Sequence, residues 1–446
     1  MMGMMDREQN SFRVPCVFPV KHREALRLVE EVPGSKSITN RALLLATMAK
    51  GTSVLDGVLF SEDSRHFLSC IEELGFPTEV EEDKRSVSVT GFGGTVPKKN
   101  ASIYVGSAGT AARFLSAYLG VLQGEYELDA SQQMRRRPMA PLLDSLKELG
   151  CEISYEKDQG CFPFRLRGHG FTRDDVSVEI SQSSQFLSAL LISAVLAEKG
   201  LRIHLQGSHG MAYVKMTQKM MEQFGVRVRE TTEEGCLNYE ILPGQQYTSR
   251  LYEIEPDVSA ACYFYAMAPL LGLEVQVKGV HFSSLQGDIA FLHVLEQMGC
   301  TVWEEQDGIV VRGQEDGVYR GVEADLSAFS DQAITLAALA PFADSPTLIR
   351  GIGHIRLQES DRMKAIVTEL RRLGIFCEAS SDSIRIEPGT PKPGLVHTYE
   401  DHRMAMGFSL LGLRTEGIVI DNPQCCKKTF EDYFTKLWNA AEQLRK

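Results

Sequence analysis

Residues 67–75 have the sequence FLSCIEELG, which indicates the fold class of this chain. Apolar side chains recur there at helical spacing, and the closing glycine suits the left-handed residue that ends many helices. The same pattern recurs four more times, and a short strand-like run follows each glycine. Successive glycines are 74 or 75 residues apart: Gly75, Gly150, Gly225, Gly299 and Gly374. A period this constant predicts a structure built from internal repeats.

A second series of helices interleaves with the first. These helices are rich in alanine and leucine, and residues 185–197 (QFLSALLISAVLA) are apolar almost all round. Helices of this kind are buried. Each is followed by a strand, and the starts, 70 to 76 residues apart, lie near Ser37, Ser107, Ser183, Asp257, Ser330 and Asp401. The sequence therefore predicts six copies of a repeat with two helices and several strands.

Six repeats with six buried helices predict an α/β fold of two inside-out domains. Each domain would hold three repeats, with the buried helices at the centre and the sheets and amphipathic helices around them. The main boundary is expected near residues 248–250, and the strand before Pro33 is expected to complete the second domain. The domains would then be residues 1–34 with 251–446, and residues 35–250. The active site is expected in the cleft between the domains, because ligands prefer such places.

The composition is that of a globular protein without nucleic-acid or membrane partners. The 446 residues are 43% hydrophobic and 24% charged, and the formal net charge is −12, which disfavours polyanionic partners. The longest nearly apolar run, residues 186–197, is too short to cross a bilayer, and the first residues lack a signal-peptide core. Ten cysteines occur without a CxxC pair, and the adjacent Cys425 and Cys426 would be poor metal ligands. We expect a cytoplasmic, monomeric protein without a metal site.

The loop at residues 33–41 (PGSKSITNR) is the first candidate anion site. It opens into an apolar helix, where backbone N–H groups and the helix dipole favour an anion. Lys36, Arg41 and the serine hydroxyls add charged and polar donors. The loop fits a phosphorylated or carboxylated small molecule, although an ordinary serine-capped helix explains this motif equally well when it is taken alone.

Two neutral loops precede other buried helices. In residues 106–113 (GSAGTAAR), Gly109 permits close approach of an anion to the backbone, and Thr110 can cap the helix. Residues 181–185 (SQSSQ) offer hydroxyls and amides that suit a phosphate or a hydroxyl group. A flexible turn and simple helix capping are the alternative explanations of these two loops.

Basic residues gather at the same repeat boundaries. A single one would be ordinary, but seven at equivalent places of an acidic protein predict a cationic cleft for two anionic substrates. They are Lys36, Arg41, Arg113, Arg137, Arg362, Arg403 and Lys428. Asp331 and Glu359 lie near these boundaries and would supply acid–base chemistry, although Asp331 could also serve only as a helix cap.

With these motifs the chain resembles the EPSP synthase family over nearly its whole length, from about residue 33 to residue 437. The resemblance rests on six motifs in order: residues 34–41 (GSKSITNR), 108–110 (AGT), 183–185 (SSQ), 359–362 (ESDR), 401–406 (DHRMAM) and 428–433 (KTFEDY). It implies two inside-out α/β domains that close on their substrates. It also implies transfer of the enolpyruvyl group of phosphoenolpyruvate to the 5-hydroxyl of shikimate 3-phosphate, with release of phosphate. This reaction belongs to the shikimate pathway of aromatic amino-acid synthesis, and the resemblance implies no metal or organic cofactor.

The resemblance also implies a role for each matching residue. Lys36 would touch both substrates, Asp331 would be the general base for the 5-hydroxyl, and Glu359 with Lys36 would move the proton at the methylene carbon. Residues 35–250 would be the shikimate 3-phosphate side, with Lys36, Ser37, Arg41, Ser183, Ser184, Gln185 and Tyr213. The donor, phosphoenolpyruvate, would be held by Gly109, Arg137, Arg362, Arg403 and Lys428, mostly from the other, catalytic domain. Further substrate-binding candidates are Thr110, Asp331 and His402.

Three residues depart from the family pattern. Gln358 replaces a lysine, Gly210 a serine and Ser107 an asparagine. The first two bear on the acceptor, so a different acceptor, or a weakly active paralogue that binds a shikimate-like ligand, are the alternatives. Transfer to UDP-N-acetylglucosamine is disfavoured, because residues 36–37 are Lys-Ser instead of Lys-Asn and residues 131–134 (SQQM) lack a reactive cysteine.

Overall fold

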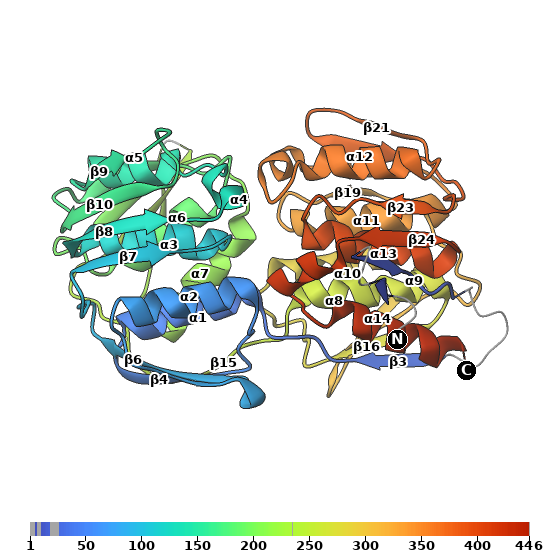
Figure 1. Cartoon of the computed structure of the whole chain (residues 1–446), viewed down its shortest axis with the longest axis horizontal. Helices are drawn as coiled ribbons and strands as arrows, with labels where there is room; N and C mark the ends of the chain where they lie inside the picture. Colours follow the sequence, from blue (N-terminus) through green and yellow to red (C-terminus); the bar gives the residue numbers. More distant parts are fainter. Residues whose placement is uncertain (1–4, 7–9, 18–25, 234, 446) are drawn as a thin grey trace. The chain divides into compact units, whose positions relative to one another are not determined.

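The chain forms two compact units, each with three four-stranded sheets (Figure 1). The computed structural model describes residues 5–6, 10–17, 26–233 and 235–445. One unit, called here the continuous unit, is Gly34–Glu255; the other, the split unit, combines Met1–Pro33 with Pro256–Lys446.

The continuous unit contains strands and helices of three repeats. Its strands, in sheet order, are β15 (Leu251–Glu253), β4 (Lys50–Asp56), β6 (Ser86–Phe92) and β5 (Thr78–Glu81); β7 (Asn100–Tyr104), β8 (Gln123–Asp129), β10 (Phe164–His169) and β9 (Glu152–Tyr155); and β11 (Asp175–Glu179), β12 (Leu201–Gln206), β14 (Cys236–Ile241) and β13 (Arg229–Glu233). Its helices are α1 (Lys36–Met48), α2 (Glu62–Glu73), α3 (Gly109–Val121), α4 (Gln132–Arg135), α5 (Ala140–Glu148), α6 (Gln185–Ala194), α7 (Met211–Gln223) and the 3-10 helix η1 (Glu82–Lys84).

The split unit is built in the same way. Its strands, in sheet order, are β1 (Met5–Asp6), β2 (Ser11–Arg13), β24 (Ile418–Asp421) and β23 (Gly394–Val396); β17 (Thr301–Glu305), β18 (Gly308–Arg312), β16 (Glu274–Lys278) and β3 (Arg27–Glu30); and β19 (Glu323–Asp325), β20 (Thr347–Arg350), β22 (Ser383–Ile386) and β21 (Cys377–Ala379). Its α-helices are α8 (Val258–Tyr265), α9 (Met267–Leu271), α10 (Phe291–Gln297), α11 (Ala333–Leu339), α12 (Arg362–Arg372), α13 (His402–Arg414) and α14 (Tyr433–Arg445). Its 3-10 helices are η2 (Gly287–Ala290), η3 (Ser330–Gln332), η4 (Ala340–Phe342), η5 (Gly353–Leu357) and η6 (Pro423–Lys428).

One repeat, from β7 to β10, shows how the helices come to be inside. β7 and β8 are parallel neighbours, and parallel strands need a crossover, which α3 supplies. β10 then pairs antiparallel with both β8 and β9. Every residue of α3 is buried, which confirms that the second series of helices forms the interior of the α/β fold.

The glycines that mark the period end helices in both units. Gly75, Gly150, Gly225, Gly299 and Gly374 have φ of +90°, +104°, +96°, +107° and +83°. Glycine adopts this left-handed backbone without the penalty that a Cβ brings. The periodic signal in the sequence is therefore a repeated helix cap.

Two strands pair far from their neighbours in the chain. β3 lies parallel to β16, with Leu28 opposite Val275, and β15 lies parallel to β4, with Tyr252 opposite Leu55. Each takes the position that the first strand of a repeat takes in the other sheets. The expected boundary at residue 250 would have left residues 251–253 outside the continuous unit, whereas the pairing of β15 with β4 extends this unit to residue 255.

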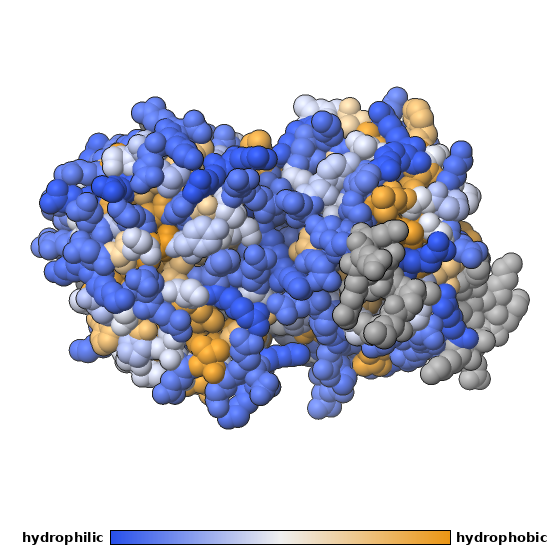
Figure 2. Space-filling view, viewed as in Figure 1, coloured by the Kyte–Doolittle hydropathy of each residue, from blue (hydrophilic) through white to orange (hydrophobic). Residues whose placement is uncertain are grey.

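The visible surface of each unit is largely hydrophilic, with scattered apolar residues (Figure 2). Such scattered exposure is normal for a globular protein. None of the helices in the described residues combines the length and the apolar character that a membrane span requires.

Glycines within strands allow the sheets to lie close to the ends of buried helices. A Cβ on Gly91 of β6 would stand 2.3 Å from the carbonyl oxygens of Ala46 and Ala49. A Cβ on Gly168 of β10 would stand 2.1 Å from the carbonyl oxygen of Leu122. Backbone atoms cannot move aside as a flexible side chain can, so these strand positions require glycine.

We predict that Gly91→Ala destabilises the protein by about 3 kcal/mol or more, because overpacking against backbone costs at least as much as overpacking a core. Chemical denaturation of both proteins measures the difference. Gly244→Ala is the control: its Cβ would meet nothing within 4 Å, although its φ is +78°, so only the left-handed penalty of about 1–2 kcal/mol applies. Equal losses in the two variants would contradict the close-approach explanation.

Candidate active site

A buried arginine is the centre of the polar cluster in the split unit. Arg362, the first residue of α12, is 1% exposed. Its Nη1 lies 3.0 Å from Asp331 Oδ1, its Nη2 2.9 Å from Glu359 Oε2, and its Nε 2.8 Å from Asp401 Oδ2. It also donates to Gln358 Oε1. Burial alone would lower the pKa of Arg362, but the charges of the three carboxylates outweigh it and raise the pKa above its usual value.

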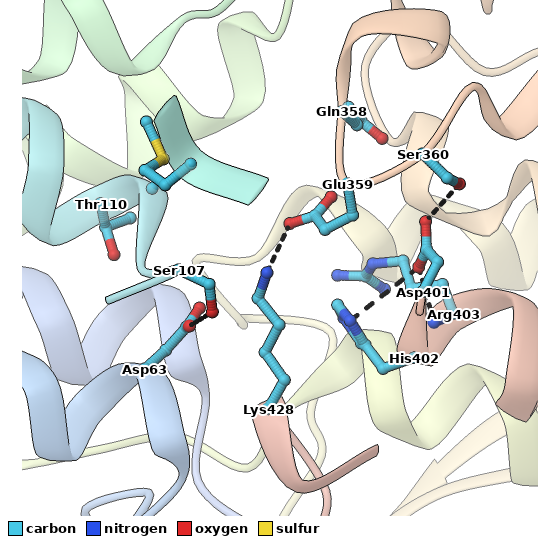
Figure 3. A network of polar contacts seen from close by, with 12 residues as sticks. Asp63, Ser107, Thr110, Gln358, Glu359, Ser360, Asp401, His402, Arg403 and Lys428 are labelled. Carbon is cyan, nitrogen blue, oxygen red and sulfur yellow. Dashed lines mark hydrogen bonds and ion pairs between the residues drawn. The ribbon is translucent and has the colours of Figure 1, made fainter. Parts of the chain in front are cut away.

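Each of the three carboxylates also faces a second donor. Asp331 Oδ2 lies 2.7 Å from Nη2 of Arg403. Glu359 Oε1 lies 3.6 Å from Nζ of Lys428, a contact that Figure 3 shows. Asp401 accepts the backbone N–H of Arg403 at 2.9 Å and so caps α13. Three cations therefore alternate with three carboxylates, which is the arrangement that makes buried charge tolerable.

The residues of this cluster come from the starts and ends of helices. Asp331 lies in η3, Glu359 lies three residues before the start of α12, Arg403 lies in the first turn of α13, and Lys428 ends η6. Backbone N–H groups at helix starts add positive potential to that of the cations. The structure thus brings together five sequence-predicted residues of the split unit: Asp331, Glu359, Arg362, Arg403 and Lys428.

His402 is the sixth predicted residue of this unit. Its ring is 1% exposed, and Nδ1 lies 3.9 Å from Asp401 Oδ1. Ser360 donates to the other oxygen of Asp401 at 2.9 Å. Asp401 was absent from the predicted site, yet it links Arg362, Ser360 and the start of α13. Its place directly before the His-Arg pair is the signal that could have identified it.

A further buried carboxylate, Asp288 in η2, lies close to the cluster. Its Oδ1 accepts hydrogen bonds from Ser259 Oγ at 2.8 Å and from Gln332 Nε2 at 2.7 Å. Burial, together with the charge of Asp331, raises the pKa of Asp288 to about 6. Sequence reasoning missed Asp288, because its partners lie in different repeats.

We predict that Asp288→Asn stabilises the protein at alkaline pH. The raised pKa means that the folded state binds this proton more tightly than the unfolded state does. The contribution of the protonated carboxyl to the free energy of unfolding is therefore complete below about pH 4 and is lost as the pH rises through about 6. Asparagine keeps an acceptor oxygen without the charge. We expect a gain on the order of 1–3 kcal/mol at pH 8, shrinking toward pH 5, as measured by urea denaturation at both values. A difference independent of pH would contradict the role of ionisation.

In the continuous unit, Lys36 faces a buried aspartate. Lys36 is the first residue of α1, and its Nζ lies 3.5 Å from Asp63 Oδ2. The other oxygen of Asp63 accepts from Ser107 Oγ at 3.4 Å, as Figure 3 also shows. Asp63 is 2% exposed. Asp63 was not among the residues predicted from the sequence, although it contacts Lys36 and Ser107, which were both noted there.

The start of α3 requires its glycine. A Cβ on Gly109 would lie 2.5 Å from Nη1 of Arg113 and 2.8 Å from Nη1 of Arg137. The neighbouring Thr110 Oγ1 accepts from Asn40 Nδ2 at 2.5 Å, which ties α3 to α1. Two guanidiniums therefore meet a bare backbone segment at a helix start, which is a suitable place for an anion.

Arg41 is 1% exposed and is held by hydroxyl and carbonyl oxygens. Its Nε donates to Thr217 Oγ1 at 2.8 Å, and its other nitrogens donate to the carbonyls of Ser37 at 3.0 Å and Tyr213 at 3.4 Å. Its guanidinium lies 5.2 Å from the ring centroid of Phe114. Burial lowers the pKa of Arg41 to about 10. Arg41 thus connects the predicted residues Ser37 and Tyr213.

The predicted serines lie at the start of α6. Ser183 Oγ accepts the backbone N–H of Gln185 at 3.3 Å, and the Gln185 side chain accepts from Arg113 at 3.4 Å. Gly210 has φ +65°, and a Cβ there would stand 2.6 Å from Ser184 Oγ. The departure at Gly210 therefore has a local explanation: glycine adopts the left-handed backbone without strain and avoids the close contact that a Cβ would make with Ser184.

Comparison with known proteins gives a consistent result. The sequence model of the family described as EPSP synthase (3-phosphoshikimate 1-carboxyvinyltransferase) matches residues 21–437. The 3-phosphoshikimate 1-carboxyvinyltransferase of Trichormus variabilis is 45% identical over 414 residues, which are 93% of this chain and 96% of that protein. The protein of the same name from Shewanella denitrificans is 40% identical over 422 residues, 93% and 97% of the two chains. A solved EPSP synthase structure from Acinetobacter baumannii has a TM-score of 0.76 at 25% identity and covers 95% of this chain and 97% of its own.

These matches, together with the two units of α/β repeats, place the chain in the class of the enolpyruvyl transferases. Within that class, the chain belongs to the EPSP synthase family. It is an enzyme of enolpyruvyl transfer in the shikimate pathway.

Proposed function

We propose that the two polar clusters divide the two substrates of this reaction between them. Most of the residues assigned to phosphoenolpyruvate, and both acid–base carboxylates, belong to the split unit, and most of those assigned to shikimate 3-phosphate belong to the continuous unit. Gly109 and Arg137 of the continuous unit are also assigned to phosphoenolpyruvate. The observation that supports this assignment best is the Asp331–Arg362–Glu359 arrangement, in which two carboxylates lie 3.0 Å and 2.9 Å from one guanidinium.

The donor is an anion with a phosphate and a carboxylate, so it requires several cations. Arg362, Arg403 and Lys428 are the candidates in the split unit. The 3.6 Å distance between Lys428 and Glu359 exceeds hydrogen-bond length, so an arriving anion can compete with Glu359 for this cation. Cations held in place before the substrate arrives stabilise charge that develops during the reaction without reorganising.

The chemistry assigns one proton transfer to each of two carboxylates. Asp331 accepts the proton of the 5-hydroxyl while the hydroxyl oxygen forms a bond to the enol carbon of the donor. Glu359, together with Lys36, delivers a proton to the methylene carbon, which gives a tetrahedral intermediate. Removal of a proton from the same carbon and cleavage of the bond to the phosphate oxygen then give the enolpyruvyl product and phosphate.

The acceptor is assigned to the helix starts of the continuous unit. Lys36, Ser37 and the serines before α6 carry hydroxyl and ammonium donors, and Arg41, which donates to the carbonyl of Ser37, adds its charge. Gln185 contacts Arg113, so a ligand at the serines is also linked to the start of α3. These donors suit a phosphate and ring hydroxyls.

Phosphate release tests the activity directly. Purified protein is incubated with phosphoenolpyruvate and shikimate 3-phosphate, and the reactions without acceptor or with UDP-N-acetylglucosamine serve as controls. We expect phosphate only with shikimate 3-phosphate. Release with the nucleotide sugar instead, or no release with either acceptor, would contradict the proposed acceptor.

We predict that Asp331→Asn and Glu359→Gln each lower kcat about 100-fold or more, the usual range for general acid–base groups. The amides keep the shape of the carboxylates, so ligand binding measured by calorimetry should change less. Glu387→Gln is the matched control, because Glu387 forms a pair with Arg385 outside the cluster. Loss of binding with normal turnover of bound substrate would show that the two carboxylates are only ligands.

Gln358 is the departure with a direct contact to the cluster, through Arg362 Nη1. A lysine at position 358 could not accept the hydrogen bond from Arg362, but Arg362 would still face three carboxylates. Glutamine can donate only a neutral hydrogen bond to the acceptor, worth about 1 kcal/mol, whereas a charged donor gives about 1.5–3 kcal/mol.

We predict that Gln358→Lys tightens binding of shikimate 3-phosphate several-fold, which corresponds to about 1 kcal/mol. Titration calorimetry of the wild type, Gln358→Lys and the neutral control Gln358→Met measures the effect, with Gln358→Met expected to bind most weakly. Weaker binding by the lysine variant would instead indicate that Gln358 is matched to a modified shikimate-like acceptor.

A further inference from the structure

The segment before α13 contains two successive residues in a rarely used backbone conformation. Tyr399 has φ +56° and Glu400 has φ +57°. Among the described residues, no other pair of adjacent non-glycine residues has positive φ. The left-handed region is sterically unfavourable for residues with a Cβ, and it persists only where the surroundings impose it.

A buried carboxylate holds this segment from one side. Glu369 lies in α12, is 0% exposed, and accepts the backbone N–H of His397 at 3.0 Å and the hydroxyl of Tyr399 at 2.7 Å. Arg372 lies 3.2 Å from both oxygens of Glu369. Helix α12, which begins with Arg362, therefore also binds residues 397–399, which lead to Asp401.

A second carboxylate holds the segment from the other side. Asp421 ends β24, and its Oδ1 accepts the N–H of Thr398 at 2.7 Å and its hydroxyl at 2.8 Å. Its Oδ2 lies 2.6 Å from Nδ1 of His397. The carbonyl of Thr398 in turn accepts the N–H of Asp401 at 2.9 Å. A short chain of hydrogen bonds thus runs from β24 to Asp401.

The segment determines where α13 starts. Asp401 follows Glu400 directly, caps α13 through the N–H of Arg403, and binds Arg362. Arg403 reaches Asp331 from the first turn. A change of backbone conformation at residues 399–400 would therefore move Asp401 and Arg403 together.

We propose that Glu369 and Asp421 are positioning residues of the enzyme: they hold the left-handed turn so that Asp401 and Arg403 meet Arg362 and Asp331. The proposal rests on the assignment of Arg403 to the donor. Neither carboxylate needs to touch a substrate. Their effect reaches the site through Tyr399 and Thr398, so weakening them should alter donor binding more than global stability.

Tyr399→Phe is the first test, because Tyr399 is 42% exposed and the variant loses only the hydroxyl that binds Glu369. We expect the KM for phosphoenolpyruvate to rise about five-fold with little change in kcat. Adding Glu400→Gly should restore the KM, because glycine adopts positive φ without strain. Tyr252→Phe is the matched control: it removes a 2.8 Å hydroxyl contact to Gln223 in the continuous unit and should leave the KM unchanged.

Amide hydrogen exchange at Arg403 gives a readout that needs no turnover. We expect faster exchange in Tyr399→Phe, and wild-type exchange after Glu400→Gly is added, since the Arg403 amide is protected by Asp401. A wild type without turnover would refute the proposed function while exchange still tests the turn. Normal turnover with unchanged KM and unchanged exchange in Tyr399→Phe, or a KM change that Glu400→Gly does not reverse, would overturn the positioning role.

Discussion

The pairing of one buried arginine with three carboxylates is the interaction on which the split unit depends. Arg362 draws Asp331, Glu359 and Asp401 to one point, and these residues come from segments before three different helices. Removing one partner of such a buried pair leaves an uncompensated charge, which costs about 3–5 kcal/mol. The arrangement of these three carboxylates, two of which are the proposed acid–base groups, therefore has the same origin as the stability of the unit.

The two units solve the problem of a buried arginine in different ways. Arg362 is neutralised by formal charges, which raise its pKa. Arg41 is surrounded by a hydroxyl, two carbonyl oxygens and an aromatic face, and burial lowers its pKa. Dipoles satisfy hydrogen bonds without supplying an opposite charge. Within the described part of the chain, the contacts of Arg41 therefore include no carboxylate, whereas Arg362 is paired with three.

The sequence predicts features that depend on local order and misses those that depend on distant partners. Gly75 and its periodic equivalents are recognisable because a helix cap is local, and Glu359 and Arg403 are recognisable because each stands in a short motif at a helix start. Asp288 carries no local signal, since Ser259 and Gln332 reach it only in the fold. Likewise, nothing within residues 251–253 indicates that they pair with β4, which is why the unit extends beyond the expected boundary.

The pairing of β3 with β16 has a consequence for how the chain is made. Residues 27–30 are synthesised long before residues 274–278, so β3 has no partner strand while the whole continuous unit is being synthesised. The continuous unit is complete once residue 255 has been synthesised, and it can fold before the partner strand of β3 is available. Closing a loop of this length delays pairing more than it weakens the final structure. The order of synthesis thus favours folding of the continuous unit first, with β3 among the last strands to pair.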